Sequence, residues 1–237
     1  MTIAENLVRV RQRAADAARR VGRLPEEIAL MAATKAFSPD VIREAYAAGQ
    51  RLFGENRVQE FADKAPQLTG LADVEFHLIG HLQSNKASKA AQLFGDIDSV
   101  DSLHLAEKLN SAAEKTGKRL RVLIEINICD EETKAGVVPD SPQLEALLAA
   151  APRLEHLEFR GLMSIPPFTQ NPEGTRPLFR ALRQLRDQIA GRRLPSVSMD
   201  VLSAGMSHDF EIAIEEGSNC VRIGTAIFGE RPPEPSQ

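Results

Sequence analysis

Apolar and polar positions vary along this chain on two length scales. Short runs of mostly branched apolar residues recur at intervals, and longer segments with helical periodicity lie between them. Nearly continuous apolar runs of this length are typical of parallel strands that are covered on both faces. We predict eight strands, at residues 28–34, 51–55, 75–80, 95–100, 121–127, 159–165, 200–205 and 220–229.

The longer segments carry helix signals at their ends. Ser38 is an N-cap candidate before a proline, either Asp101 or Ser102 opens a later segment, and the glycines at 49 and 117 follow the last turns. Strands that alternate with helices pair in parallel through right-handed crossovers. We predict further helices from Thr2 to about Val21, over 139–151, over 172–191 and from about Asp209.

Eight such units in a chain of 237 residues predict a single α/β domain, a (β/α)8 TIM barrel with an extra N-terminal helix. The alternative is an open doubly wound sheet, but no GxGxxG follows the first run and no P-loop occurs. No linker rich in Pro, Gly or Ser divides the chain, so we expect the barrel to cover residues 1–229. Residues 230–237 are predicted to be a disordered tail because prolines crowd this end.

Composition narrows the function classes. The chain has 43% apolar and 26% charged residues and a net charge of −4, and no run approaches the length that spans a bilayer. The first residues lack the apolar segment of a signal peptide, so we expect a cytoplasmic protein without a membrane partner. One Tyr, no Trp and no basic stripe argue against a nucleic-acid partner.

Polar and flexible residues gather at the predicted carboxyl ends of the strands, where barrels of this kind carry their chemistry. Lys35 follows the first strand. A lysine partly desolvated at a barrel mouth has a lowered pKa, and its neutral amine can form a Schiff base with a carbonyl. That carbonyl can belong to a substrate, as in aldolases, or to pyridoxal phosphate. The other strand ends carry Glu55 with Asn56, Gly80 with His81, Asp98 to Asp101, Asn127, Met163 with Ser164, Ser203 with Gly205, and Gly224 with Thr225.

The last two strand ends favour the phosphorylated aldehyde. Gly205 and Ser207 lie between the seventh strand and a predicted helix, and Gly224 and Thr225 follow the eighth strand. Loops after strands seven and eight form the common phosphate site of TIM barrels. Each glycine on its own is equally compatible with a tight turn.

The chain closely resembles the pyridoxal phosphate homeostasis proteins, small relatives of the N-terminal barrel of alanine racemase. The resemblance rests on "AATK" with Lys35, "FGENRVQE" (53–60), "FHLIGHLQSNK" (76–86), "SVDS" (99–102), "INICDEETKAG" (126–136), "GLMSI" (161–165) and "LSAGMSHDFEIAIEEGSNCVRIGTAIFG" (202–229). It implies that Lys35 carries pyridoxal 5'-phosphate as a Schiff base. It further implies phosphate contacts from Ser207, Gly224 and Thr225, Arg222 facing the pyridine nitrogen, Asn56 beside the cofactor, and Ser203, Met163 and His77 lining the pocket.

The chain departs from the family pattern at three places. Phe37 replaces a second lysine of the first loop, Phe76 replaces a tryptophan, and "ATKAFSP" stands where many members have "VSKTKP". The loss of that second amine puts in doubt any transfer of the cofactor that uses it. Lys134, in the charged loop with Glu131 and Glu132, matches a family lysine and is a candidate encounter site for the cofactor.

The family resemblance leads to a binding protein rather than an efficient catalyst. A permanent positive charge from Arg222 disfavours protonation of the cofactor's ring nitrogen, which weakens its electron sink. Racemisation needs acid/base groups on both faces of the substrate, and the chain's one tyrosine, Tyr46, is predicted inside a helix. We therefore expect a protein of vitamin B6 homeostasis that holds pyridoxal phosphate on Lys35 without significant catalysis.

Two other activities stay open. One is a single-domain pyridoxal-phosphate-dependent amino-acid racemase with Lys35 as its base, and the other is a Schiff-base aldolase without a cofactor. Candidate recipients of the cofactor are pyridoxal-phosphate-dependent apo-enzymes, and a monomer or weak dimer is expected. His77 and His81 have a metal-like spacing, but they lie on either side of a glycine at a strand end, so we predict no metal site.

Overall fold

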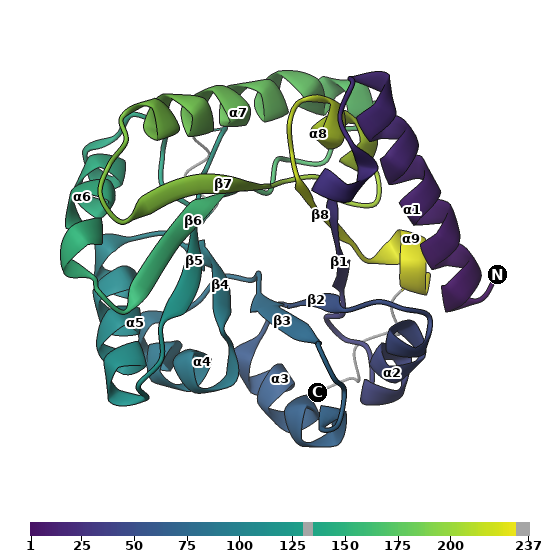
Figure 1. Cartoon of the computed structure of the whole chain (residues 1–237), viewed down its shortest axis with the longest axis horizontal. Coiled ribbons are helices and arrows are strands. Elements are labelled where there is room, and N and C mark those ends of the chain that lie inside the picture. The colour runs from purple at the N-terminus through teal and green to yellow at the C-terminus, as the bar shows by residue number, and fades with distance from the viewer. Residues whose placement is uncertain (130–134, 231–237) are drawn as a thin grey trace.

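The computed structural model describes residues 1–129 and 135–230. In it, eight parallel strands close into a barrel in which neighbours follow the order of the sequence (Figure 1). The prediction of a TIM barrel with an extra N-terminal helix is confirmed. The strands are β1 (Ala29–Ala33), β2 (Leu52–Glu55), β3 (Glu75–Leu78), β4 (Asp96–Val100), β5 (Leu120–Glu125), β6 (Leu157–Met163), β7 (Val197–Ser203) and β8 (Cys220–Ile223).

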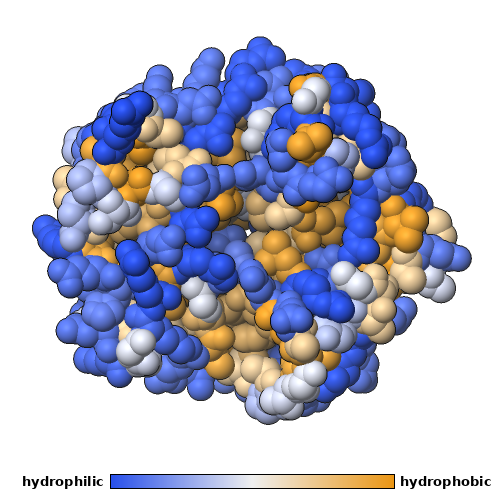
Figure 2. All heavy atoms as spheres, in the orientation of Figure 1, coloured by the Kyte–Doolittle hydropathy of each residue, from blue (hydrophilic) through white to orange (hydrophobic). Residues whose placement is uncertain are grey.

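Helices surround the barrel. Thr2 caps the first of them with a capping box, and Ser102 and Ser141 accept hydrogen bonds from backbone N–H groups of α5 and α6. Hydrophilic residues cover the surrounding helices, and hydrophobic residues show toward the middle of the ring (Figure 2). The helices are α1 (Ile3–Arg20), α2 (Pro39–Ala47), α3 (Val58–Lys64), α4 (Ala87–Leu93), α5 (Leu103–Lys115), α6 (Pro142–Ala150), α7 (Arg176–Gly191), α8 (Phe210–Glu215) and α9 (Thr225–Phe228), with 3-10 turns at Pro25–Glu27, Ala65–Leu68, Ser84–Lys86, Ala151–Arg153 and Pro172–Thr175.

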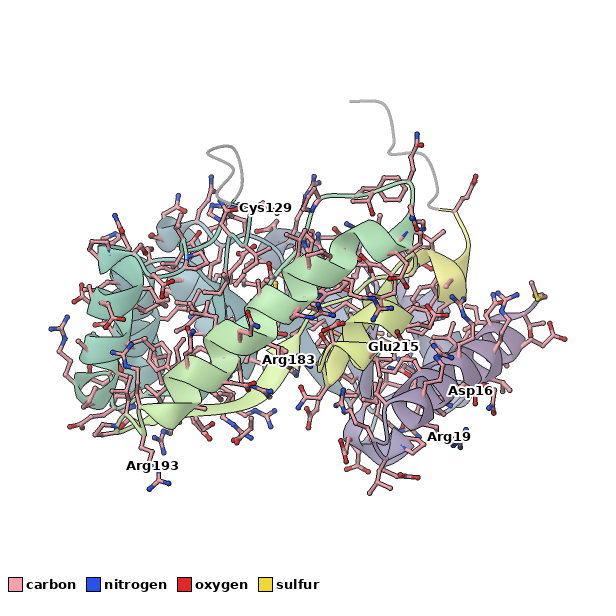
Figure 3. All side chains as sticks on the ribbon, turned by 90° about the horizontal axis from the view of Figure 1, so that it is seen from above. Asp16, Arg19, Cys129, Arg183, Arg193 and Glu215 are labelled. Atoms are coloured by element: carbon pink, nitrogen blue, oxygen red, sulfur yellow. The ribbon has the colours of Figure 1, made fainter. Side chains whose placement is uncertain are left out.

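The carboxyl ends of all eight strands meet at one mouth because the strands run parallel. Cys129, which follows β5, lies at one edge of the molecule, and Arg193, which precedes β7, lies at the opposite edge (Figure 3). Residues at the start of a strand and residues just past its end therefore lie at opposite ends of the barrel. This polarity decides which of the predicted site residues can meet.

The prediction for the last strand was wrong beyond Ile223. Residues 225–228 form α9, in which the N–H groups of Ile227 and Phe228 donate to the carbonyl of Gly224. Ile227 is buried, and the side-chain amide of Asn6 on α1 donates to its carbonyl at 2.8 Å. The apolar residues after β8 thus pack against the N-terminal helix instead of extending the sheet.

The extra helix α1 is tied to the end of the chain. Besides the Asn6 contact, Arg13 pairs with Glu211 of α8 at 2.6 Å. No helix in the described residues is long and apolar enough to cross a bilayer. The predicted tail from residue 231 onward, and Glu131, Glu132 and Lys134, lie outside the described residues, so those predictions and the domain limits stay predictions.

Candidate functional site

A cavity of about 780 Å³ opens at the carboxyl ends of the strands. Residues from the ends of β1, β2, β3, β5 and β8 and from the loops after β6 and β7 line it. The structure brings six of the nine predicted site residues to its wall, namely Lys35, Asn56, Ser207, Arg222, Gly224 and Thr225. Residues more than 180 positions apart in the chain thus share one concave site, as the carboxyl end of a TIM barrel predicts.

His77 is not brought to this cavity, and its predicted place there is corrected. Its Cα partner on β4 is Asp96, the first residue of that strand, so His77 belongs to the opposite end of the barrel. There it lines a separate cavity of about 120 Å³, and its Nδ1 lies 3.1 Å from Asp98 Oδ1. The residues of the "FHLIGHLQSNK" segment that line the cavity are Ile79, Gly80 and His81.

Met163 and Ser203 do not line the cavity either. Both are fully buried, and they are Cα partners across the β6–β7 ladder. Ser203 still contributes indirectly, because its Oγ accepts a hydrogen bond of 2.7 Å from Arg222. It is a positioning residue for the arginine rather than a wall of the site.

The backbone on both sides of Lys35 is held by neighbouring elements. On one side, the hydroxyl of Thr34 donates to Glu55 at 2.7 Å, and Nζ of Lys64 donates to the carbonyl of Thr34 at 3.1 Å. On the other side, the N–H of Ala36 donates to Glu60 at 2.7 Å. Lys35 itself is half-buried at the cavity wall. Its amine is therefore presented from a fixed backbone rather than from a loose loop.

A buried ion pair supports this arrangement. Lys64 Nζ lies 3.1 Å from Glu55 Oε2 and 2.6 Å from Glu60 Oε1. Burial raises the pKa of Glu55, and the nearby Lys64 charge opposes that shift. Glu55, which the sequence placed among the candidate rim residues, is thus a structural partner of Lys64 within the wall.

Arg222 presents a buried cation to the cavity. Its guanidinium donates to Ser203 Oγ at 2.7 Å and to the carbonyl of Ser164 at 2.8 Å. Both acceptors are uncharged, so they orient the group without neutralising it. Burial lowers the pKa of Arg222, and the surrounding groups Cys220, Asp98, Glu125 and Asp209 act in the opposite direction.

The two glycines that favoured a phosphate site differ. Gly205 has φ +98°, and a Cβ there would lie 2.6 Å from the Cβ of Ala213, so packing and backbone conformation require this glycine. A Cβ on Gly224 would meet only Ala33, at 3.5 Å and beyond. The space in front of Gly224 belongs to the cavity and suits a ligand. Ser207 lies beside it, with its Oγ accepting from the N–H of Ala226 at 3.2 Å.

Phe37, which replaces a family lysine, is buried and lines the cavity. Its ring centroid lies 4.8 Å from that of Phe228 on α9. This position therefore supplies apolar packing where the family pattern has a second amine. Phe76, which stands where the family often has a tryptophan, has ring contacts to Phe53 and Phe61.

Sequence reasoning missed Glu125, the last residue of β5. Its side chain lines the cavity, only 6% of the residue is exposed, and its Oε2 has no hydrogen-bond partner in residues 1–129 and 135–230. Burial raises the pKa of Glu125 to about 7. The available signal was a single acidic residue inside the apolar run "VLIEIN".

A three-residue cluster at the other end of the barrel has the spacing of a metal site. Ligand atoms of Glu75, His77 and Asp96 lie within 4.8 Å of one another. Arg121 already bonds both carboxylates, at 2.7 Å to Asp96 and 3.4 Å to Glu75. A guanidinium thus supplies the positive charge that a metal ion would bring. His81, whose spacing from His77 resembles a metal-site spacing, lies 3.1 Å from Asp101.

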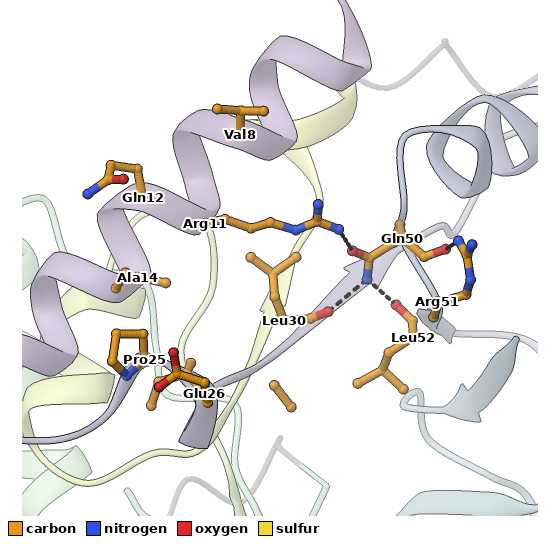
Figure 4. A pocket seen from close by; sticks show the side chains of 13 residues that line it. Val8, Arg11, Gln12, Ala14, Pro25, Glu26, Leu30, Gln50, Arg51 and Leu52 are labelled. Atoms are coloured by element: carbon orange, nitrogen blue, oxygen red, sulfur yellow. Dashed lines mark hydrogen bonds between the residues drawn. The ribbon is translucent and has the colours of Figure 1, made fainter. Parts of the chain in front are cut away.

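A groove of about 660 Å³ lies outside the barrel, between α1 and the strands β1 and β2 (Figure 4). Three of its polar side chains, Arg11, Gln50 and Arg51, are paired with one another or with backbone. Gln50 donates to the carbonyls of Leu30 and Leu52, and Arg11 donates to Gln50 at 3.2 Å. The groups that converge at the strand ends make the larger cavity the better candidate for a functional site.

Comparisons with known proteins show the family of the chain. The family model described as the alanine racemase N-terminal domain matches residues 3–232. The chain is similar to the pyridoxal phosphate homeostasis protein of Aquifex aeolicus, with 46% identity over 98% of this chain and 99% of that one. It is also similar to the Escherichia coli protein of that name, with 45% identity over 97% of each chain.

The chain is also similar to solved structures. PipY of Synechococcus elongatus, solved with pyridoxal phosphate bound, is 38% identical and superimposes with a TM-score of 0.84 over 96% of this chain and 100% of that chain. An alanine racemase of Clostridium difficile is 16% identical with a TM-score of 0.74, over 98% of this chain and 58% of that chain. The second likeness shows a shared fold.

Proposed function

This chain belongs to the alanine racemase N-terminal domain family, and from that premise we propose that it binds pyridoxal 5'-phosphate in the cavity of Lys35 and serves vitamin B6 homeostasis. The observation that carries the proposal is the meeting of Lys35, Arg222 and Gly224 in one cavity. An amine, a buried cation and an open glycine match the aldehyde, the ring and the phosphate of this cofactor.

Lys35 is the proposed Schiff-base residue. Its neutral amine adds to an aldehyde, and one water leaves as the C=N bond forms. The hydrogen bonds that hold Thr34 and Ala36 fix the backbone from which the amine reaches the cavity. The pre-set geometry lowers the entropic cost of forming the bond.

Ser207, Gly224 and Thr225 are the proposed phosphate contacts. Ser207 and Thr225 offer hydroxyls, and Gly224 offers backbone without a side chain in front of it. The bond from Ala226 N–H to Ser207 Oγ ties the loop after β7 to the turn after β8. The two segments can therefore act as one rim, with the anion between them.

The position of Arg222 favours a protein that holds the cofactor over one that uses it for catalysis. When bound, the cofactor supplies an electron sink that is strongest if its ring nitrogen is protonated. Arg222 is oriented by the uncharged acceptors Ser203 and Ser164, and in the proposed complex its positive charge lies near the ring. A cation at that place disfavours a second positive charge on the nitrogen.

A racemase is the second candidate, because the family includes the barrel of alanine racemase. It requires a second acid/base group opposite Lys35. Tyr46, the one tyrosine of the chain, lies on α2, where its hydroxyl donates to the carbonyl of Ala72 and Arg51 stacks on its ring at 4.0 Å. It is not among the cavity residues, which weighs against a tyrosine-dependent racemase.

Visible absorption of the purified protein tests the proposal. The wild type and the exposed-lysine control Lys108→Ala should bind added pyridoxal phosphate with a yellow band, and Lys35→Ala should lose that band. Borohydride should then fix the cofactor to Lys35 in the wild type. A wild type without the band, or a band that persists in Lys35→Ala, would contradict the assignment. Deuterium exchange at the α-carbon across an amino-acid panel, lost in Lys35→Ala, would favour the racemase.

A further inference from the structure

Glu125 is a buried acid that the chain itself leaves unsatisfied. It ends β5, its residue is 6% exposed, and within the described residues its Oε2 accepts no hydrogen bond. Its backbone carbonyl, in contrast, accepts a hydrogen bond of 2.8 Å from the N–H of Val137. A buried polar atom without a partner is costly, and such groups in native proteins call for a functional reason.

The side chain faces the proposed cofactor cavity. Its neighbour across the β5–β6 ladder is Met163, an uncharged residue. The charged groups that act on it come from three other elements: Asp101 after β4, Arg222 on β8 and His81 after β3. Asp101 disfavours the carboxylate, and Arg222 and His81 favour it.

Burial, together with Asp101, outweighs Arg222 and His81 and raises the pKa of Glu125 to about 7. The Glu125 side chain therefore gains or loses its proton near neutral pH. A protonated carboxyl has an O–H to donate, whereas a carboxylate only accepts. Pyridoxal phosphate offers oxygens on its ring and its phosphate, all of which accept hydrogen bonds.

We propose that Glu125 is a binding residue of the cavity whose proton controls how tightly the cofactor is held. The neutral carboxyl donates a hydrogen bond to a ligand oxygen, and the carboxylate repels it. This inference rests on the proposed binding of pyridoxal phosphate. It assigns Glu125 the role of making retention of the cofactor depend on pH.

The sign follows from proton linkage. Binding prefers the protonated acid, so the affinity is highest below the pKa of Glu125 in the ligand-free protein and falls as the pH rises through it. One linked proton allows a loss of up to about tenfold per pH unit. The titration of Lys35 adds its own pH dependence, so the informative quantity is the ratio of wild-type Kd to the Kd of a variant at Glu125.

The decisive variant is Glu125→Gln, which keeps the shape and an N–H donor but does not ionise. Kd for pyridoxal phosphate is measured by absorption from pH 6 to pH 9 for the wild type, Glu125→Gln and the exposed control Glu114→Gln. We expect the ratio of wild-type Kd to Glu125→Gln Kd to rise at least tenfold across this range, and the control to follow the wild type. A ratio that stays constant with pH would overturn the inference.

Proton uptake gives an independent readout. Calorimetry at pH 8 in buffers of different ionisation enthalpy measures the protons taken up on binding. The wild type should bind as much as one proton more than Glu125→Gln. Equal proton uptake would contradict the role of Glu125. Should Glu125→Gln fail to fold, a wild-type uptake that does not change between pH 6 and pH 8 would overturn it equally. If the wild type binds no pyridoxal phosphate at any pH, the proposed function fails, and that result is distinct from binding with a flat ratio.

Discussion

The backbone N–H of Ala36 donates a hydrogen bond of 2.7 Å to Oε1 of Glu60. The bond crosses from the residue after Lys35 to helix α3, and it holds Ala36 at φ +64°, a conformation that L-residues rarely adopt. Lys64 pairs with the same carboxylate at 2.6 Å. A glutamate outside the cavity thus fixes the backbone that carries the proposed Schiff-base lysine.

Removing this acceptor should weaken the site. We expect Glu60→Ala to lower the affinity for pyridoxal phosphate by about tenfold, which equals about 1.4 kcal/mol, because the backbone at Lys35 is no longer held. Glu60→Gln, whose amide oxygen can still accept from Ala36, should lose less. Equilibrium titration by absorption measures both, with Glu44→Ala on the exposed face of α2 as the control. Equal affinities for Glu60→Ala and the control would refute the positioning role.

Alanine substitution of two glycines near the proposed phosphate site should affect different properties, ligand affinity for Gly224 and stability for Gly205. Gly224→Ala places its methyl group in ordinary contact with Ala33 and should leave the melting temperature within about 2 °C, while it lowers cofactor affinity at least about tenfold. Gly205→Ala strains a positive φ and meets Ala213, so it should cost about 2 kcal/mol or more, roughly 4–8 °C. Calorimetric melting and titration separate the two effects. An unchanged affinity in Gly224→Ala would remove that glycine from the ligand site.

The buried pair of Lys64 and Glu55 should be a strong stability determinant. Lys64→Met leaves the Glu55 carboxylate buried without its cation, which should cost about 3–5 kcal/mol at pH 8. Burial already raises the pKa of Glu55, so the acid can take up a proton and the deficit should shrink as the pH falls toward 5.

Urea unfolding at pH 5 and pH 8 tests this prediction, with Lys89→Met on the exposed face of α4 as the control. The double variant Glu55→Gln/Lys64→Met should recover part of the loss, because it removes the unpaired charge. A Lys64→Met deficit that stays the same at both pH values would show that the uncompensated carboxylate is not its cause.

His77 should make the stability of the barrel depend on pH. Burial disfavours its imidazolium, but the carboxylates of Asp98, Asp96 and Glu75 outweigh burial and raise the pKa of His77 in the folded protein. A raised folded-state pKa gives stability that is fully present below the unfolded value of about 6.5 and is lost as the pH rises through the folded value.

The comparison is the free energy of unfolding of the wild type and His77→Gln. We expect the advantage of the wild type to be larger at pH 6 than at pH 9, with His104→Gln as the control on α5. The opposite order would mean that the histidine is held neutral in the fold.

Much of the site follows from order along the chain. Eight apolar runs separated by helical segments predict the barrel, and the barrel's parallel strands predict that Lys35, Asn56 and Gly224 meet at one mouth. The segment after Ile223 was wrongly predicted as strand because its apolar residues suit a strand and a buried helix equally. Ile227 is buried and bonded to Asn6 of α1, a contact with the other end of the chain.

Position along a strand cannot tell by itself which layer of the barrel a side chain occupies. His77 lies only three residues before Gly80, yet its register with Asp96 puts it at the far end of the barrel, because each strand residue advances about 3.3 Å along the barrel wall. Gly205 and Gly224 look alike in sequence, and only the atoms around them distinguish a packing requirement from open space.

The periodicity of apolar residues was sufficient to specify the barrel, because strand and helix periods are local properties of the chain. The direction of the strands predicted which end of the barrel carries Lys35, because the carboxyl ends of parallel strands lie together. Tertiary packing decided the rest: that Ser203 positions Arg222, that Glu60 holds Ala36, and that Glu125 faces the cavity with an unsatisfied oxygen. Burial and hydrogen-bond satisfaction depend on atoms brought together from distant parts of the chain, so no local pattern encodes them.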